Sequence, residues 1–297
     1  MIFKTHVVHY DHGFVFIREW RPPTVLGVIH LFHGMMEHSG MYHAWATKLT
    51  AMGWAVVAHD HAGAGYTVHR HCRRDALPNN GKAVLLEVAG VARRWINQQY
   101  SNQPVVAYGH SMGAFVVMSA INHLPPTAGV ILTGSTYEPQ WRLALKSAAL
   151  RFFLLFTNAL SPALLAHVIT FAPLIWAIKP RTSDYDWVSR NPAVLKHYMA
   201  DAMCGNVSSW GYFYTLTQLL RGMMDGVLSY QQRLLVLTGS KDPLSNGGKA
   251  LLGCLKKRED NQLPVEHVVL AGAHHKVEDD IDDAKVLTQI EGFLAKL

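Results

Sequence analysis

This chain has few cysteines and little charge. Only three cysteines occur among its 297 residues, at positions 72, 204 and 254, and they are widely spaced and odd in number. This pattern excludes a disulfide framework and a cysteine-based zinc site, and it fits a reducing cytoplasm. Charged residues make up 16% of the chain against 49% hydrophobic ones. We therefore expect a large core and some exposed apolar surface.

The sequence also lacks segments that would target or anchor it. Its first residues (MIFKTH) do not form an apolar signal segment. The most apolar stretch, residues 143–178, is interrupted by charged residues and prolines, so no window is long enough to span a bilayer. The net charge of +6 comes from scattered basic residues without an aromatic-rich basic stripe, which argues against nucleic-acid binding. We expect a cytoplasmic protein.

Cofactor motifs are missing as well. Histidine is abundant, with 18 residues, but neither H-E-x-x-H nor a comparable set of metal ligands occurs. Residues 63–65 (GAG) lack the third glycine and the following helix that a dinucleotide site needs. The sequence therefore predicts neither a metal nor an organic cofactor.

What the sequence does contain is a regular alternation of strand-like and helix-like runs. Short apolar runs typical of buried strands alternate with longer runs whose apolar residues have helical spacing. The strand-like runs are 26–32, 54–59, 104–108, 129–133, 233–238 and 265–270, and the helix-like runs are 42–52, 82–99, 111–123, 247–257 and 283–297. This order predicts an α/β fold, a mostly parallel sheet with helices on both faces. Residues 5–9 and 13–20 predict an antiparallel hairpin at the sheet edge.

The alternation stops between residues 135 and 226, where the chain is apolar and helical without clear strands. We interpret residues 1–135 and 226–297 as the core. Residues 136–225 then form a helical cap inserted over the C-terminal ends of the strands, where open α/β folds bind ligands. The sequence leaves three interpretations of the apolar cap open: helical core, a tunnel for an acyl chain, and a surface that contacts a membrane or a second subunit.

A candidate nucleophile lies between a strand and a helix. Residues 109–113 (GHSMG) follow the run 104–108 and precede a helix-like run. In that context G-x-S-x-G predicts a sharp turn that raises Ser111 above the sheet edge, with glycines where side chains would collide. The alternative is a serine that only caps the next helix.

A nucleophilic serine needs a base, and the base needs an orienting carboxylate. Asp242 follows the strand 233–238, and His274 and His275 follow the strand 265–270, which is the order Ser, acid, His that accompanies this turn. We favour Asp242 because it follows a strand one strand–helix unit before the histidines. Only one of two adjacent histidines can face the serine. The rival acids are Asp279, Asp280, Asp282 and Asp283.

An ester hydrolase also needs two donors for the oxyanion. The backbone N–H of Met112 follows the nucleophile at a helix N-terminus, where the dipole favours negative charge. The second donor should come from the loop 33–36, after the strand 26–32, and Met35 N–H is the best candidate.

Five motifs together carry a family resemblance. Residues 33–42 (HGMMEHSGMY) resemble H-G-x-x-E-H-S-x-x-Y, residues 58–65 (AHDHAGAG) a D-x-x-G-x-G turn, residues 109–113 a G-H-S-M-G elbow, residues 239–243 (GSKDP) an acid loop, and residues 272–275 (GAHH) a G-A-x-H loop. In this order they resemble the monoacylglycerol lipase and lysophospholipase branch of the α/β-hydrolases. The resemblance selects His275 over His274.

The resemblance implies a serine hydrolase with the triad Ser111, Asp242 and His275, acting on lipid-like esters such as monoacylglycerols or lysophospholipids. A short-chain carboxylesterase, a thioesterase and a small peptidase would use the same site. Outside enzymes, the alternative is a hydrolase-fold binding protein. Peripheral membrane contact through the cap and a homodimer are left open. One departure from the family is Ala64, and another is Lys276, which would perturb His275 or favour an anionic substrate.

Overall fold

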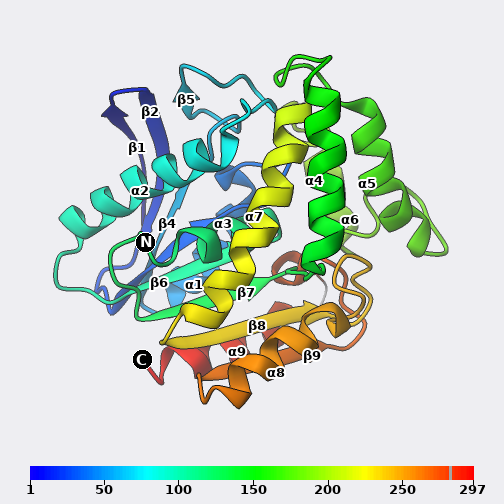
Figure 1. Cartoon of the computed structure of the whole chain (residues 1–297). Coiled ribbons are helices and arrows are strands. Elements are labelled where there is room, and N and C mark those ends of the chain that lie inside the picture. Colours follow the sequence, from blue (N-terminus) through cyan, green and yellow to red (C-terminus); the bar gives the residue numbers. More distant parts are fainter. Residues whose placement is uncertain (281–282) are drawn as a thin grey trace.

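The computed structural model describes residues 1–280 and 283–297. Asp282, one of the rival acids, lies outside the described residues. Within the described part of the chain, one nine-stranded sheet has the order β1-β2-β4-β3-β6-β7-β8-β9, and β5 pairs with β2. Figure 1 shows the helices packed around this sheet.

The sheet is parallel from β4 to β9 and antiparallel at its β1–β2 edge. The strands are β1 (Ile2–Tyr10), β2 (Gly13–Arg21), β3 (Gly27–Phe32), β4 (Trp54–His59), β5 (Val68–His69), β6 (Val105–His110), β7 (Gly129–Thr133), β8 (Arg233–Gly239) and β9 (Val265–Leu270). The predicted mostly parallel sheet and the edge hairpin are thus confirmed.

Helices cover both faces of the sheet because its strands are apolar on both sides. One face packs against α2 (Gly81–Gln99), α3 (Met112–Ala120), α7 (Trp210–Ser229) and α8 (Leu252–Asp260), and the other against α1 (His43–Ala51) and α9 (Asp283–Leu294). Neighbouring residues of β3 point to opposite cores, with Val28 in one and Ile29 in the other. Complete burial of such a side chain contributes about 1.5–3 kcal/mol.

The helices between β7 and β8 form a separate group. They are α4 (Gln140–Leu154), α5 (Leu164–Ala177), α6 (Pro192–Ala200) and α7. Figure 1 shows α4, α5 and α6 gathered beyond one end of the sheet, with α4 packed along α7. The C-terminal half of α7 contacts α3 so closely that a Cβ at Gly226 would lie 2.0 Å from the carbonyl oxygen of Met118. Thus α7 joins this group to the sheet.

This group also carries exposed apolar side chains. No helix among the described residues is long and apolar enough to cross a membrane. On α4 and α5 and the loop between them, however, large apolar side chains face solvent: Trp141, Leu145, Phe152, Phe153, Leu155, Phe156, Leu164, Leu165, Val168, Ile169 and Trp176. The exposed apolar surface expected from the composition is therefore concentrated on these two helices.

Candidate active site

Ser111 lies in a strained turn between β6 and α3. Its backbone has φ +51° and ψ −120°, a conformation that costs a non-glycine residue about 1–3 kcal/mol. The turn is held by the N–H of Ser111, which donates to the carbonyl of Thr133 at 2.9 Å. Among the described residues, its side chain accepts no capping hydrogen bond. The alternative of a simple helix cap is therefore wrong.

The two glycines of the motif allow this turn. A Cβ at Gly109 would lie 2.6 Å from Cα of Ala114, and one at Gly113 would lie 2.1 Å from the carbonyl oxygen of Phe32. Both contacts are with backbone, which cannot move aside. The strand and the helix can therefore approach each other around Ser111 only because both positions lack a side chain.

Asp242 and His275 meet at the C-terminal ends of β8 and β9. Nδ1 of His275 lies 3.2 Å from Oδ1 of Asp242, a close contact whose geometry falls short of a well-formed hydrogen bond. Such contacts often tighten only when substrate binds. Both side chains are almost fully buried, with 3% and 0% exposure. Burial alone would raise the pKa of Asp242, but His275 and hydrogen bonds from Ser245 and from the N–H of Leu244 lower it. The carboxylate is thus ionised at neutral pH.

The rival acids in the described residues have other partners. Asp279 pairs with Lys276, Asp280 with Arg190, and Asp283 with Lys48. His274 does not share the position of His275. Its Nδ1 lies 2.6 Å from the carbonyl oxygen of Asp186, in the segment between α5 and α6.

A second loop lies against the serine. A Cβ at Gly34 would lie 3.4 Å from Cβ of Ser111, so the loop after β3 touches the turn directly. The N–H of Gly34 donates to Oε1 of Glu37 at 2.6 Å, and the hydroxyl of Tyr42 donates to the same oxygen at 2.5 Å. Met36 adopts a left-handed φ of +59°. Glu37 therefore fixes the turn on which Met35 lies.

Lys276 connects the histidine loop to this second loop. Its Nζ lies 3.0 Å from both Glu37 and Asp279, and 4.1 Å from the centre of the Tyr42 ring. Burial alone would lower the pKa of Lys276, but the carboxylates of Asp279 and Glu37 raise it. The ammonium is thus charged and already paired. The sequence had suggested that Lys276 could favour an anionic substrate. Because its charge is already paired, it is not a free cation for such a substrate.

The pair His110 and Glu278 was not anticipated from the sequence. Nδ1 of His110 lies 3.0 Å from Oε1 of Glu278, and the rings of His110 and His275 lie 4.9 Å apart. Burial would lower the pKa of His110, but Glu278 raises it. His110 occupies the variable position of the G-x-S-x-G motif and Glu278 lies in an acidic run. Neither the motif position of His110 nor the acidic run around Glu278 indicates an ion pair between two residues that lie 168 positions apart.

The segment between α5 and α6 supports the histidine from the other side. The ring of Trp187 lies 4.9 Å from the ring of His275. The backbone N–H of His275 donates to the carbonyl of Trp187 at 3.2 Å, and that of Lys276 to the carbonyl of Val188 at 2.7 Å. The orientation of His275 thus depends on residues outside the sheet.

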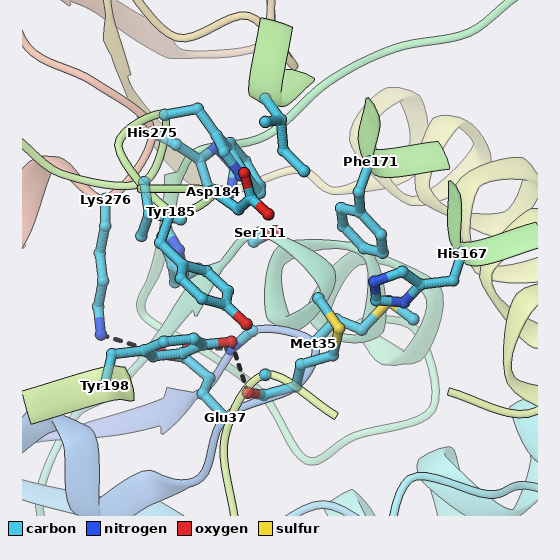
Figure 2. A pocket seen from close by; sticks show the side chains of 17 residues that line it. Met35, Glu37, Ser111, His167, Phe171, Asp184, Tyr185, Tyr198, His275 and Lys276 are labelled. Carbon is cyan, nitrogen blue, oxygen red and sulfur yellow. Dashed lines mark hydrogen bonds and ion pairs between the residues drawn. The ribbon is translucent and has the colours of Figure 1, made fainter. Parts of the chain in front are cut away.

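Ser111 borders two cavities of different character. The larger has a volume of about 570 Å³ and extends between α4, α5 and α7, where its walls are mostly apolar, including Phe115, Leu150 and Phe213. The smaller has a volume of about 140 Å³, and Glu37, His275 and Lys276 contribute to its polar lining. Figure 2 shows the side chains that line this smaller cavity, among them those of Ser111 and His275.

Four buried histidines lie beneath the loop after β3. Nε2 of His30 lies 3.0 Å from Nδ1 of His59, and the N–H of His61 donates to Nε2 of His33 at 3.0 Å. All four are fully excluded from solvent. Burial lowers their pKa values, that of His33 to about 4 and the other three well below 6.5. These imidazoles are neutral in the folded protein.

We expect the protein to lose several kcal/mol of stability between pH 6.5 and pH 5. In this range the four histidines bind protons in the unfolded state but stay neutral in the folded state. Each of them therefore lowers the free energy of unfolding by about 1.4 kcal/mol per pH unit. His110, whose pKa is raised, adds little in this range, because the stability that it contributes is already complete below pH 6.5 and is lost only as the pH rises through its folded pKa. Urea denaturation at several pH values measures the slope.

The double variant His30→Leu/His59→Leu tests the assignment. Removing two of these rings should reduce the slope of unfolding free energy against pH by about 2.7 kcal/mol per unit. His123→Leu, which changes an exposed histidine, is the matched control and should leave the slope unchanged. An unchanged slope in the double variant would show that other groups cause the acid sensitivity.

Two groups of side chains in the described residues have the spacing of metal ligands. They are His12 with His69 and Glu87, and His38 with Asp201 and Cys204. Neither group includes Ser111, Asp242 or His275. The chemistry available at the serine is therefore that of a hydroxyl, an imidazole and a carboxylate.

Comparison with known proteins adds an independent observation. A family model described as serine aminopeptidase, S33, matches residues 23–282. The monoacylglycerol lipase of Mycolicibacterium smegmatis is 27% identical over 280 residues, covering 93% of this chain and 90% of its own. The monoglyceride lipase of Homo sapiens is 26% identical over 282 residues, covering 94% and 85%.

Among solved structures, a highly thermostable carboxyl esterase from Bacillus coagulans, in complex with glycerol, is similar over the whole molecule. It has a TM-score of 0.87 and 19% sequence identity, and the match covers 100% of this chain and 99% of the esterase. At this identity the likeness shows the fold, and it confirms the predicted fold class.

Proposed function

The chain belongs to the serine aminopeptidase S33 family of the α/β-hydrolases, and on this premise we propose that it cleaves the ester bond of single-chain lipids, with monoacylglycerols as the preferred class. The protein is a carboxylic ester hydrolase acting on a small ester substrate, as its relatives are lipases and esterases. The observation that carries the finer assignment is the position of Ser111 between a large apolar cavity and a small polar one.

The two cavities suit the two halves of such a substrate. A volume of about 570 Å³ is in the range of sites that enclose whole small molecules, and its apolar walls favour an acyl chain. The smaller cavity, of about 140 Å³, would hold the alcohol. Its cations are already neutralised, Lys276 by Glu37 and His110 by Glu278. An uncharged glycerol is therefore favoured over the phosphate of a lysophospholipid.

The reaction follows from the residues around the serine. Oγ of Ser111 attacks the ester carbonyl while Nε2 of His275 takes its proton, and Asp242 orients the ring and stabilises the imidazolium. The tetrahedral intermediate collapses, the C–O bond breaks, and His275 returns the proton to the leaving alcohol. Water, deprotonated by His275, then attacks the acyl-enzyme, and the fatty acid and free Ser111 are formed.

Two backbone amides are proposed to stabilise the oxyanion. The N–H of Met112 lies in the first turn of α3, where the helix dipole favours negative charge. The N–H of Met35 lies on the turn that Glu37 holds against Ser111. Loss of one such donor typically costs about 100- to 1000-fold in kcat.

We also propose that residues 136–225 form a cap that contacts lipid surfaces. The apolar side chains exposed on α4 and α5 are accompanied by five basic and no acidic residues between positions 140 and 181. Apolar side chains with basic neighbours are typical of helices that lie on anionic membranes. A homodimer and a cytoplasmic location stay predictions.

The acyl-chain dependence of kcat/KM tests the function. Each methylene that enters the apolar cavity is worth about 0.8 kcal/mol, so kcat/KM should rise about fourfold per methylene until the cavity is full. A series of monoacylglycerols and p-nitrophenyl esters measures this, together with lysophospholipids of the same chains. A preference for the shortest chains would contradict the lipid assignment and favour a short-chain esterase, and absence of turnover on every ester would favour a binding protein.

Ala166→Phe sharpens this test. Ala166 lines the apolar cavity, so the added ring should shorten the preferred chain and lower kcat/KM for long chains at least tenfold, with short esters little affected. Ala177→Phe places the same ring at an exposed position of α5 and should leave the profile unchanged. Equal profiles in both variants would exclude this cavity as the acyl site.

A further inference from the structure

A second cluster of chemically active side chains lies at the antiparallel edge of the sheet. Nδ1 of His12 is 2.8 Å from Oε1 of Glu87, and Nε2 of His69 is 3.7 Å from Oε2 of the same carboxylate. One ligand atom from each residue lies within 4.8 Å of the others. The cluster joins the β1–β2 turn, β5 and α2, and the proposed ester hydrolysis uses none of its residues.

The backbone brings these three elements together. Gly13 pairs with His69 across β2 and β5, and the N–H of Arg70 donates to the carbonyl of His12 at 2.9 Å. A Cβ at Gly13, which has φ +146°, would lie 2.1 Å from the carbonyl oxygen of Val68. Glycine is therefore required for β5 to approach the turn this closely, and the approach places the two imidazoles on opposite oxygens of Glu87.

The surroundings contain a polar group without a partner. The hydroxyl of Tyr10 is buried and has no hydrogen-bond partner among the described residues. The Tyr10 ring lies 6.0 Å from that of His12 and 6.2 Å from that of His69. The Tyr10 ring thus packs beside both imidazoles of the cluster.

We propose that His12, His69 and Glu87 bind a divalent transition metal ion, with Zn²⁺ as the favoured occupant. Two imidazoles and one carboxylate are an established set of three zinc ligands, which leaves the fourth position for water. Zinc holds nitrogen and oxygen ligands at about 2.0–2.2 Å, so the ligand atoms of a filled site lie closer to one another than 4.8 Å. The three ligand atoms of this cluster would therefore have to move slightly toward one another. Small side-chain rotations of the partly exposed His12 and Glu87 would close the set.

The second nitrogen of His69 would change its hydrogen bonding when a metal binds. Nδ1 accepts from the N–H of His71 at 3.2 Å and lies 3.7 Å from Sγ of Cys72. A metal on Nε2 requires the proton on Nδ1, so binding would replace the hydrogen bond from the His71 N–H by one from Nδ1 to Sγ of Cys72.

A metal here would stabilise the segment that follows β5. This segment supports the start of α7, since the N–H of Ser209 donates to the carbonyl of Asp75 at 2.9 Å and the N–H of Leu77 to Oγ of Ser209 at 3.2 Å. Binding to the folded protein would stabilise it by mass action. The inferred effect is on the stability of the fold and is independent of the proposed esterase activity.

Titration of the tag-free, EDTA-treated protein with ZnCl₂ tests the proposal. Calorimetry should give one tight equivalent, and thermal denaturation should show a Tm that rises with Zn²⁺ concentration. Glu87→Gln and His12→Ala, which change partly exposed residues, should each weaken binding at least tenfold and abolish the rise in Tm. Both variants should keep the metal-free Tm within a few degrees.

His9→Ala provides the matched control, because His9 is an exposed histidine of β1, close to the β1–β2 turn and outside the cluster. It should bind Zn²⁺ as the unaltered protein does. Absence of binding at millimolar Zn²⁺, or equal affinity in Glu87→Gln, His12→Ala and the unaltered protein, would overturn the proposal. Equal affinity would direct attention to His38, Asp201 and Cys204 instead.

Discussion

Replacing Ser111 by alanine is expected to lower kcat/KM for a monoacylglycerol by about five to six orders of magnitude. Loss of the nucleophile removes the acyl-enzyme route and leaves only binding and oxyanion stabilisation, which retain about 10³- to 10⁴-fold over water. Since the triad acts as a unit, further removal of His275 should add little. Steady-state hydrolysis at saturating and limiting substrate separates kcat from KM.

The same variant should remain folded. Alanine has the same left-handed backbone cost as serine at φ +51°, and Ser111 makes no side-chain cap in the described structure. A Tm within a few degrees of the unaltered protein would therefore exclude unfolding as the cause. Residual activity within a hundredfold of the unaltered protein would contradict the assignment of Ser111.

Replacing Lys276 by methionine is expected to destabilise the protein by about 3–5 kcal/mol, since removal of one partner leaves a buried charge uncompensated. The ammonium is 3% exposed and Glu37 is 5% exposed, so water cannot replace the lost contact. Glu37 also holds the N–H of Gly34. Activity should therefore fall together with stability, as the turn carrying Met35 loosens. Urea denaturation measures the free energy.

Two further variants separate the causes. In Lys276→Met/Glu37→Gln/Asp279→Asn none of the three buried charges of this network remains, so more than half of the lost stability should return. Lys48→Met makes the same change at the partly exposed ion pair with Asp283 and should cost no more than about 1 kcal/mol. Equal effects of Lys276→Met and Lys48→Met would contradict the buried network.

The sheet was predictable from sequence because its central strands β3, β4, β6 and β7 are buried on both faces and mostly apolar. Periodicity located β3, β4, β6, β7, β8 and β9 within about two residues. It missed β5, since two residues carry no period. The helix expected at 247–257 begins later, as η2 (Lys249–Leu251) and then α8. Gly247 and Gly248, with φ of +61° and +85°, cannot open a helix.

The candidate site was predictable as far as it consists of local motifs. The turn at Ser111 and the loops of Asp242 and His275 each have a signature within a few residues. The roles of these residues, and of the Met35 and Met112 amides, stay predictions. Glu37, Lys276 and Glu278 could not be assigned partners, since their contacts join residues more than 100 positions apart. Such contacts leave no periodic trace in the sequence.

The most direct test is covalent labelling with a fluorophosphonate, followed by intact mass and peptide mapping. A serine activated by His275 should react with one equivalent, located on Ser111. The label should disappear in Ser111→Ala and persist in Ser101→Ala, which changes an exposed serine. A label that persists in Ser111→Ala, or one that maps to another serine, would contradict the central claim that Ser111 is the nucleophile.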